Sequence, residues 1–435
     1  MPGPWPLTTA RDDAGALTVG GVAVTDLAAR FGTPLWVVDE ADLRERCRRY
    51  REGFPDVEVA YASKAWCSVG VLQIVDEEGL SVDVASGGEL HTALVAGVPP
   101  ERLILHGNNK SEAELDRALE VGVGRIVVDS FEEIDRLERL AAARDVQAPV
   151  ALRITPGIDA HTHEYVRTGH DDAKFGFTLS LGLADEALAH AHRCPHLDVV
   201  GIHAHIGSQI FGTEPFVANV EVAVDLLARW RAEHGVELGE INLGGGMGIR
   251  YTHEDHPVEV ARYGRAVLEA LDERCAAHGY PRPHLVIEPG RAIVGPSTIT
   301  VYEVGTVKAL PGLTTWVSVD GGMSDNIRPA LYDAEHEVAL ANRSSDAEPR
   351  ACTVVGKHCE SGDLVREHAP LPSDVAVGDL VAVAATGAYT ESMASNYNRL
   401  PRPAAVLVSD GAVRELVRRE TLDDLVRRDV PLRRA

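Results

Sequence analysis

Eight short apolar runs, each followed by a segment of helical periodicity, constrain this chain more than any other feature. Runs rich in Val, Ile and Leu that alternate with amphipathic segments are typical of parallel strands joined by crossover helices. Eight such units over about 250 residues match a closed (β/α)8 barrel. An open doubly wound sheet is the alternative, although such sheets more often stop at about five or six strands. The runs span 57–64, 80–86, 103–107, 125–130, 150–155, 199–207, 240–245 and 284–290.

The pattern changes after residue 291 to strands without helices between them, separated by Gly, Pro and Asp turns. The first 34 residues contain the hairpin-like ALTVGGVAV, which is expected to add a strand to this region. We therefore predict an α/β protein with a TIM barrel over 35–291 and a mostly antiparallel β domain formed by 1–34 and 292–435. A flexible loop is expected at 338–350. The expected strands of the β domain span 299–307, 314–320, 351–357, 379–386 and 404–410.

Charge and composition exclude several classes of partner. The 435 residues carry 42 basic and 66 acidic side chains, a formal charge of -24, which repels nucleic acid and anionic membranes. No apolar stretch approaches the roughly 20 residues of a membrane span, and the start has no signal-peptide pattern. The six cysteines form no Cys-x-x-Cys pair, so neither a disulfide framework nor a structural zinc site is expected. These features predict a cytoplasmic protein.

Polar residues follow the predicted strands at their carboxyl ends. In a closed barrel these ends surround one mouth, where reacting groups gather. Their convergence predicts an active site at that mouth. In strand order the candidates are Lys64; Asp83 and Ser86; His106 and Asn108; Asp129; Arg153; His203, His205 and Ser208; Gly244, Gly245 and Gly246; Glu288 and Arg291.

Lys64 is the most informative of these residues. The chain has only five lysines, yet one ends the apolar run VEVAYASK. An amine in a partly desolvated pocket can lose its proton and condense with a carbonyl as a Schiff base, whereas arginine stays protonated. A lysine that extends its amine to water from a strand end is the ordinary alternative.

The segment INLGGGMGIRY places three glycines directly after a strand. Glycine lets backbone N–H groups approach and bind a phosphate, although barrel loops also need glycine for steric reasons. Ser208 and Arg291 could add phosphate donors.

His203 and His205 share one face of their strand, which is compatible with zinc, given a third ligand, or with a ring stacked on a flat cofactor. Glu288 could pair with Arg291 or hold a proton on a heterocyclic nitrogen.

Seven motifs along the chain indicate a protein family. YASKAW, HIGSQIF, NLGGGMG, EPGR, GGMSDNIRPALY, GKHCESGD and TGAYTESMASNYNR resemble the pyridoxal-phosphate-dependent decarboxylases of the alanine-racemase-like barrel fold, most closely the diaminopimelate decarboxylases. The resemblance runs from about residue 30 to 405. It implies pyridoxal 5'-phosphate as cofactor, and it implies a barrel joined to a β domain.

The resemblance also implies roles in cofactor binding. Lys64 holds the cofactor aldehyde, His205 stacks on the pyridine ring and Glu288 keeps the ring nitrogen protonated. Asp83 and Arg153 match positions near the cofactor. The phosphate is held by Ser208, Gly244, Gly245, Gly246 and Arg291, with Tyr389 donating from the β domain.

Substrate contacts and the proton donor follow in the same way. Arg291, Arg328, Tyr332 and Tyr389 look like the family's substrate contacts. Cys359 matches the thiol that protonates the carbanion after carbon dioxide leaves, and Glu360 resembles the residue that selects diaminopimelate. Because family members supply this Cys–Glu pair across a dimer, a homodimer with shared sites is expected.

The activity implied is decarboxylation of meso-2,6-diaminopimelate to L-lysine and carbon dioxide, the last step of lysine biosynthesis. The alternatives are a decarboxylase of ornithine, lysine or another diamino acid, a racemase of the same barrel type, or a non-catalytic regulatory relative. Glu360, Arg328 and Tyr332 disfavour the first alternative. Cys359 and the long β domain disfavour the second, and the retention of Lys64 and Cys359 disfavours the third.

Overall fold

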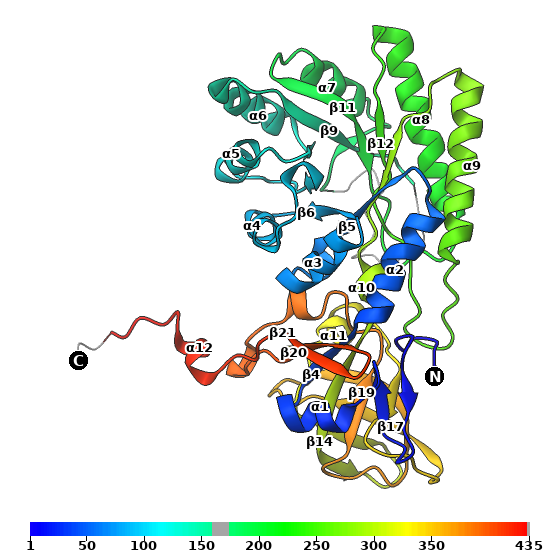
Figure 1. The fold of residues 1–435 in the computed structure, drawn as a ribbon, viewed down its shortest axis with the longest axis vertical. Coiled ribbons are helices and arrows are strands. Elements are labelled where there is room, and N and C mark those ends of the chain that lie inside the picture. The colour runs from blue at the N-terminus through cyan, green and yellow to red at the C-terminus, as the bar shows by residue number, and fades with distance from the viewer. Residues whose placement is uncertain (159–173, 433–435) are drawn as a thin grey trace. The chain divides into compact units, whose positions relative to one another are not determined.

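The eight apolar runs form eight parallel strands that close into a barrel in the computed structural model, which describes residues 1–158 and 174–432 (Figure 1). The strands pair in chain order, and the last pairs with the first. A short additional strand, β10 (Phe177–Thr178), pairs with β9. The predicted barrel is confirmed. Its strands are β5 (Glu58–Ala62), β6 (Ser81–Val84), β7 (Leu103–Leu105), β8 (Arg125–Val128), β9 (Ala148–Thr155), β11 (Leu197–Ala204), β12 (Glu240–Asn242) and β13 (His284–Ile287).

The segments that follow the strands form amphipathic helices, because their apolar residues repeat at helical spacing. Ser111 begins one of them, with its side chain accepting a hydrogen bond from the Glu114 N–H in a capping box. The helices of this region are α2 (Glu40–Gly53), α3 (Val69–Glu77), α4 (Gly87–Ala96), α5 (Glu112–Val121), α6 (Phe131–Arg144), α7 (Leu183–His192), α8 (Glu214–His234), α9 (Val260–His278) and α10 (Arg291–Val294).

The barrel interior is filled by small and branched side chains, while ion pairs lie at the amino ends of the strands. Arg125 contacts Glu58 at 2.7 Å and Glu240 at 2.6 Å, and His284 lies 3.0 Å from Glu58. These charged groups pair with one another, so this end is structural and the opposite end remains for chemistry. A buried cluster in the interior comprises Ala60, Ile104, Val127, Ala151 and Val286.

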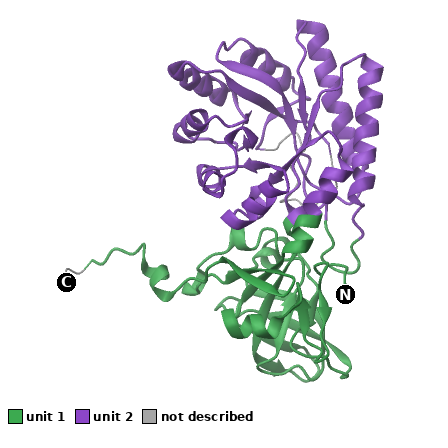
Figure 2. Ribbon diagram, in the orientation of Figure 1, with its two compact units in different colours: residues 1–45, 249–255, 294–435 green, residues 46–248, 256–293 purple. Residues whose placement is uncertain are grey.

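The chain divides into two compact units (Figure 2). The barrel unit comprises 46–248 and 256–293, and the second unit, called the β unit here, comprises 1–45, 249–255 and 294–435. No helix among the described residues is long and apolar enough to cross a membrane.

The β unit contains a nine-stranded sheet in which β14 pairs with three other strands. Antiparallel pairs predominate in this sheet, as predicted, and two pairs, β15 with β17 and β4 with β20, are parallel. The strands are β4 (Leu35–Asp39), β14 (Thr298–Ala309), β15 (Thr315–Val319), β16 (Val338–Leu340), β17 (Pro349–Val355), β18 (Leu364–Pro372), β19 (Leu380–Val383), β20 (Ala404–Ser409) and β21 (Ala412–Val417).

The remaining elements of the β unit are small. A three-stranded sheet joins β1 (Ala10–Arg11), β2 (Leu17–Val19) and β3 (Val22–Ala23). The hairpin predicted near residue 20 is therefore confirmed, but it forms a sheet of its own. The helices are α1 (Val24–Phe31), α11 (Arg328–Tyr332) and α12 (Leu422–Val426).

Two sequence expectations differ from the structure. β4 lies in the β sheet between β14 and β20, whereas the barrel was expected to begin at residue 35. Its apolar run LWVVD is buried along its whole length, and either sheet could bury such a run. The segment 338–350 is not a single loop, because β16 and the start of β17 lie within it.

Candidate active site

A buried carboxylate organises the mouth of the barrel. Glu288, directly after β13, accepts hydrogen bonds from His106 Nε2 at 2.8 Å, Asn242 Nδ2 at 2.7 Å and His203 Nε2 at 3.1 Å. The partners come from the ends of β7, β12 and β11, so closure of the barrel brings them together. All four side chains are buried.

The electrostatics of this cluster favour an ionised Glu288 carboxylate beside a neutral His203 imidazole. Burial opposes the charge on Glu288, but His106 and His203 lower the pKa of Glu288 well below its usual range. Burial lowers the pKa of His203 to about 4. A neutral imidazole can donate from Nε2 and leave Glu288 negative, so Glu288 can accept a further N–H from a heterocycle.

Asp83 adds a second buried carboxyl group from β6. Burial raises the pKa of Asp83 to about 6, and its Oδ1 lies 3.9 Å from His106 Nε2. Its Oδ2 has no hydrogen-bond partner among the described residues. A buried oxygen of this kind is typical of a functional site.

Lys64 lies in a 3-10 helix, η1 (Ser63–Ala65), directly after β5. Its charge acts on Asp83 and on His205, which places the amine within electrostatic reach of both side chains. The residue is exposed, so the protein alone does not provide the partly desolvated pocket that was expected.

His205 and Gly244 approach each other closely at the ends of β11 and β12. Gly244 has φ +66°, and a Cβ there would lie 2.8 Å from His205 Nδ1, so glycine is required. The Gly244 N–H donates to Asn242 Oδ1 at 2.8 Å. Burial lowers the pKa of His205 well below its ordinary value, which favours a neutral ring.

The other predicted phosphate donors also lie together. The buried Arg291 donates to Ser208 Oγ from Nη2 at 2.9 Å and from Nε at 3.3 Å. Gly246 packs against the Gly207 carbonyl, where a Cβ would lie 2.5 Å away. A guanidinium, a hydroxyl and a glycine run therefore meet at the last strands of the barrel, as a phosphate site requires.

Arg153, predicted near the cofactor, is buried on β9. Its guanidinium lies 3.9 Å from Asp129 and over the Phe175 ring at 4.3 Å, and burial lowers the pKa of this guanidinium. Its charge also acts on His203 and His205, which is consistent with a place near the mouth.

The remaining predicted residues lie in the β unit. Arg328 of α11 is buried, with its guanidinium 5.0 Å from the Tyr251 ring and 5.6 Å from the Tyr332 ring. Tyr389 is half-buried and has φ +59°, a strained conformation that is frequent at functional sites.

Cys359 and Glu360 are exposed on the loop between β17 and β18. No disulfide joins the six cysteines, all of which lie in the described part of the chain.

The sequence placed His106 among the candidates at the barrel mouth without assigning it a role, and Asn242 was missed. Asn242 ends the strand before the glycines of NLGGG, which is the signal that could have found it. Such a position predicts proximity to the mouth, but not a hydrogen bond to Glu288, because that depends on strand register.

Three side chains of this cluster are also close enough to share a metal ion. One possible ligand atom from each of His106, His203 and Glu288 lies within 4.8 Å of the other two. The same imidazole nitrogens hydrogen-bond Glu288 directly. These contacts describe a hydrogen-bonded cluster without invoking a metal ion.

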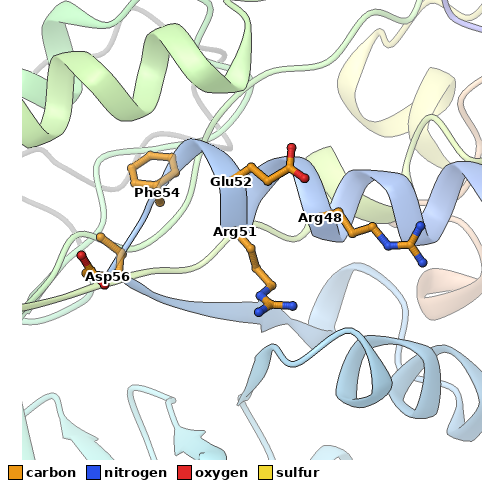
Figure 3. Close-up of a pocket in the computed structure, with 6 residues that line it drawn as sticks. Arg48, Arg51, Glu52, Phe54 and Asp56 are labelled. Carbon is orange, nitrogen blue, oxygen red and sulfur yellow. The ribbon is translucent and has the colours of Figure 1, made fainter.

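A separate pocket of about 390 Å³ lies at the end of α2 (Figure 3). It is at the amino end of β5, away from Lys64 at the carboxyl end. The guanidinium of Arg48, one of its lining residues, binds both carboxylate oxygens of Glu78 at 2.9 Å. Its charge therefore has a partner within the barrel unit.

The chain belongs to the pyridoxal-dependent decarboxylases, because the family model described as "Pyridoxal-dependent decarboxylase, pyridoxal binding domain" matches residues 40–295. Within that class it is 47% identical to the diaminopimelate decarboxylase of Bacillus subtilis, over 98% of both chains. The diaminopimelate decarboxylase of Mycobacterium tuberculosis is also 47% identical, over 99% of this chain and 98% of the relative. A crystal structure of the M. jannaschii diaminopimelate decarboxylase in complex with L-lysine matches with a TM-score of 0.92 and 32% identity, over 98% of each chain. The resemblance predicted from the motifs is confirmed.

Proposed function

We propose that this protein decarboxylates meso-2,6-diaminopimelate to L-lysine and carbon dioxide, with pyridoxal 5'-phosphate as cofactor. The observation that carries the proposal is the buried Glu288, held by three side-chain donors at the mouth of the barrel of a chain whose relatives are diaminopimelate decarboxylases. The lysine-bound relative of the same fold supports the product.

The residues at the mouth fit pyridoxal phosphate by their chemistry. Glu288 can accept the N–H of a protonated pyridine, and the imidazole of His205 can stack on its ring. Ser208 and Arg291 can bind a phosphate, together with the backbone of Gly245 and Gly246. Lys64 offers the amine that an aldehyde needs. When bound, the cofactor accepts the electron pair left by the departing carbon dioxide.

The chain's own residues orient the substrate and exclude competing reactions. Arg328 and Tyr332 bind a substrate carboxylate, for which the planar guanidinium of Arg328 is suited. Glu360 faces the distal ammonium group of diaminopimelate. The Cys359 thiol supplies the proton that replaces the carboxyl group. The distal contacts hold the bond to be broken in the reactive orientation.

Cys359 and Glu360 act in the site of a second copy, so the functional unit is a homodimer. The exposure of both residues on their loop supports this arrangement. Size-exclusion chromatography with light scattering tests it, and a monomer that is active at every concentration would contradict it.

The test of function is the release of carbon dioxide and L-lysine from meso-diaminopimelate, measured with and without added pyridoxal phosphate. Parallel reactions with L-ornithine and L-lysine should release little carbon dioxide. Borohydride treatment of the loaded protein should attach the cofactor to the peptide that contains Lys64. Lys64→Arg keeps the charge and should remove both the adduct and the activity. Full activity in that variant would overturn the proposal.

A further inference from the structure

A buried carboxylate lies behind the loop that carries Cys359 and Glu360. Asp363 Oδ1 accepts a hydrogen bond from the Met323 N–H at 2.6 Å. Its Oδ2 accepts from the His358 N–H and from His358 Nδ1, both at 2.8 Å. The side chain of Asp363 is 3% exposed and that of His358 is fully buried. One carboxylate thus joins two loops, since Met323 precedes α11 and His358 precedes Cys359.

Two glycines make room for this carboxylate. A Cβ at Gly322, where φ is +144°, would lie 2.3 Å from Asp363 Oδ1, and a Cβ at Gly356 would lie 2.2 Å from Asp363 Oδ2. Any other residue at either position would displace the carboxylate. The loops also meet through the Lys357 N–H, which donates to the Gly321 carbonyl at 2.9 Å. The glycines of GGMSDN and GKHCESGD therefore serve one shared contact.

A second contact holds the same loop from the segment 397–398. The Tyr397 ring stacks on His358 with 5.7 Å between centroids and 7° between planes. The Cys359 N–H donates to Asn398 Oδ1 at 2.8 Å, and the Tyr397 hydroxyl lies 3.4 Å from Glu360 Oε2. Asn398 has φ +51°, a strained conformation that its neighbours must maintain. Cys359 and Glu360 are exposed, but their backbone is fixed on both sides.

We propose that Asp363 is a positioning residue that fixes the Cys359 thiol and the Glu360 carboxylate relative to Arg328. The loop bound at Met323 leads directly into α11, which begins at Arg328. Asp363 therefore ties the loop that offers Cys359 and Glu360 to the site of the second copy to the helix whose Arg328 serves this chain's own site. Tyr397 supports the same loop through His358. The inference rests on the proposed function, because that function gives Cys359 and Glu360 their roles.

Asp363→Asn tests the proposal because it keeps the size of the side chain while placing an amide N–H₂ against N–H donors. The measurement is the rate at which iodoacetamide alkylates Cys359 in the cofactor-loaded protein without substrate, resolved by mass spectrometry of peptides. Cys359 is exposed, whereas the other five cysteines are buried or half-buried and serve as internal references. Asp346→Asn, in an exposed loop, makes the same charge change.

The expected result is a rise of about fivefold in Cys359 alkylation in Asp363→Asn, the value of one ordinary hydrogen bond. Rates at the other cysteines and the absorbance of the bound cofactor should not change. The kcat should fall by about tenfold or more, because displacement of a reacting group costs orientation. Asp346→Asn should behave as the native protein does.

Tyr397→Ala provides an independent arm, because it removes the stacking on His358 and leaves Asp363 in place. It should also raise Cys359 alkylation, whereas Tyr397→Phe keeps the ring and should not. If Asp363→Asn unfolds, so that all six cysteines react, Tyr397→Ala alone decides. If Cys359 is alkylated in every folded variant at the same rate as in the unaltered protein, the positioning role is overturned. Because labelling needs no substrate, this result stands even if meso-diaminopimelate is not decarboxylated.

Discussion

The barrel unit and the β unit hold their candidate reacting groups in opposite ways. In the barrel, Glu288 is buried and bonded to the side chains of His106, His203 and Asn242. In the β unit, Cys359 and Glu360 are exposed, and buried neighbours such as Asp363 hold their backbone. Under the proposed function, this difference means that the barrel preorganises a charge for a bound cofactor, whereas the β unit presents groups that the second copy covers in the dimer.

The largest effect is expected for the proton donor, whose removal should lower kcat without affecting cofactor binding. Cys359→Ala should lower kcat on the order of 10³-fold, since a positioned general acid is removed. The absorbance of the bound cofactor should stay native, because the barrel holds it. Cys194→Ala, at a half-buried thiol of the barrel, is the control. Loss of cofactor binding in Cys359→Ala would contradict the assignment of cofactor binding to the barrel unit.

Glu288→Gln tests the buried charge of the barrel. The amide cannot accept from three donors, so it should destabilise the fold by about 1–3 kcal/mol. Without a negative charge beside the pyridine nitrogen, kcat should fall roughly 10²-fold. Thermal unfolding and steady-state kinetics measure the two effects. Glu269→Gln, on the exposed part of α9, should alter neither, and native kinetics in Glu288→Gln would remove Glu288 from the mechanism.

Acid should act with opposite sign on His203 in the barrel unit and on Asp325 in the β unit. The pKa of His203 is lowered to about 4 by burial, below its ordinary 6.5, so the unfolded chain takes up the proton first. The stability that neutral His203 contributes is therefore lost as pH falls from about 6.5 towards 4, by about 2 kcal/mol at pH 5 relative to pH 8. Protonation of Asp83, whose pKa burial raises to about 6, offsets part of this loss in the barrel. Burial raises the pKa of Asp325 in the β unit to about 7, so its protonation below pH 7 favours the fold there.

His203→Gln isolates the barrel contribution to this pH dependence, because Gln can donate to Glu288 but does not titrate. Urea unfolding of the native protein and the variant at pH 8 and pH 5 provides the comparison. The difference between the two pH values should shrink by about 2 kcal/mol in the variant. An unchanged difference would show that His203 carries a proton in the folded barrel.

The smallest effect concerns the phosphate. Ser208→Ala removes the hydroxyl that Arg291 contacts and should weaken binding of pyridoxal phosphate about tenfold, the value of one charge-assisted hydrogen bond. Tyr389→Phe should weaken it by a similar factor, because the family resemblance assigns that hydroxyl to the same phosphate. An absorbance titration measures both constants. An unchanged constant in Tyr389→Phe would confine cofactor binding to the barrel.

The sequence predicts the barrel well because each of its strands is a short, mostly apolar run between turns. The run at 103–107, for example, becomes β7 at 103–105. It does not predict β18, because LVREHAPLP mixes charges and prolines and pairs with only β17. The apolar run of β4 predicts a buried strand but not its sheet, because sheet membership depends on partners distant in the chain.

The same limit applies to the site. The position of Lys64 after an apolar strand and the glycines of NLGGG predict the mouth of the barrel. The bond of Asp363 to the Met323 N–H could not be predicted, since it joins two loops at positions 40 residues apart. Motifs thus identify the groups that react, and tertiary contacts decide what holds them.

The place of β4 has a consequence for how the protein is made. The ribosome produces this strand near the beginning of synthesis, whereas its partners β14 and β20 emerge only after the entire barrel. Until then an apolar strand remains unpaired on the nascent polypeptide, which is the state that recruits chaperones or leads to aggregation. The barrel can fold during translation, but the sheet of the β unit can form only after its last strands have been synthesised.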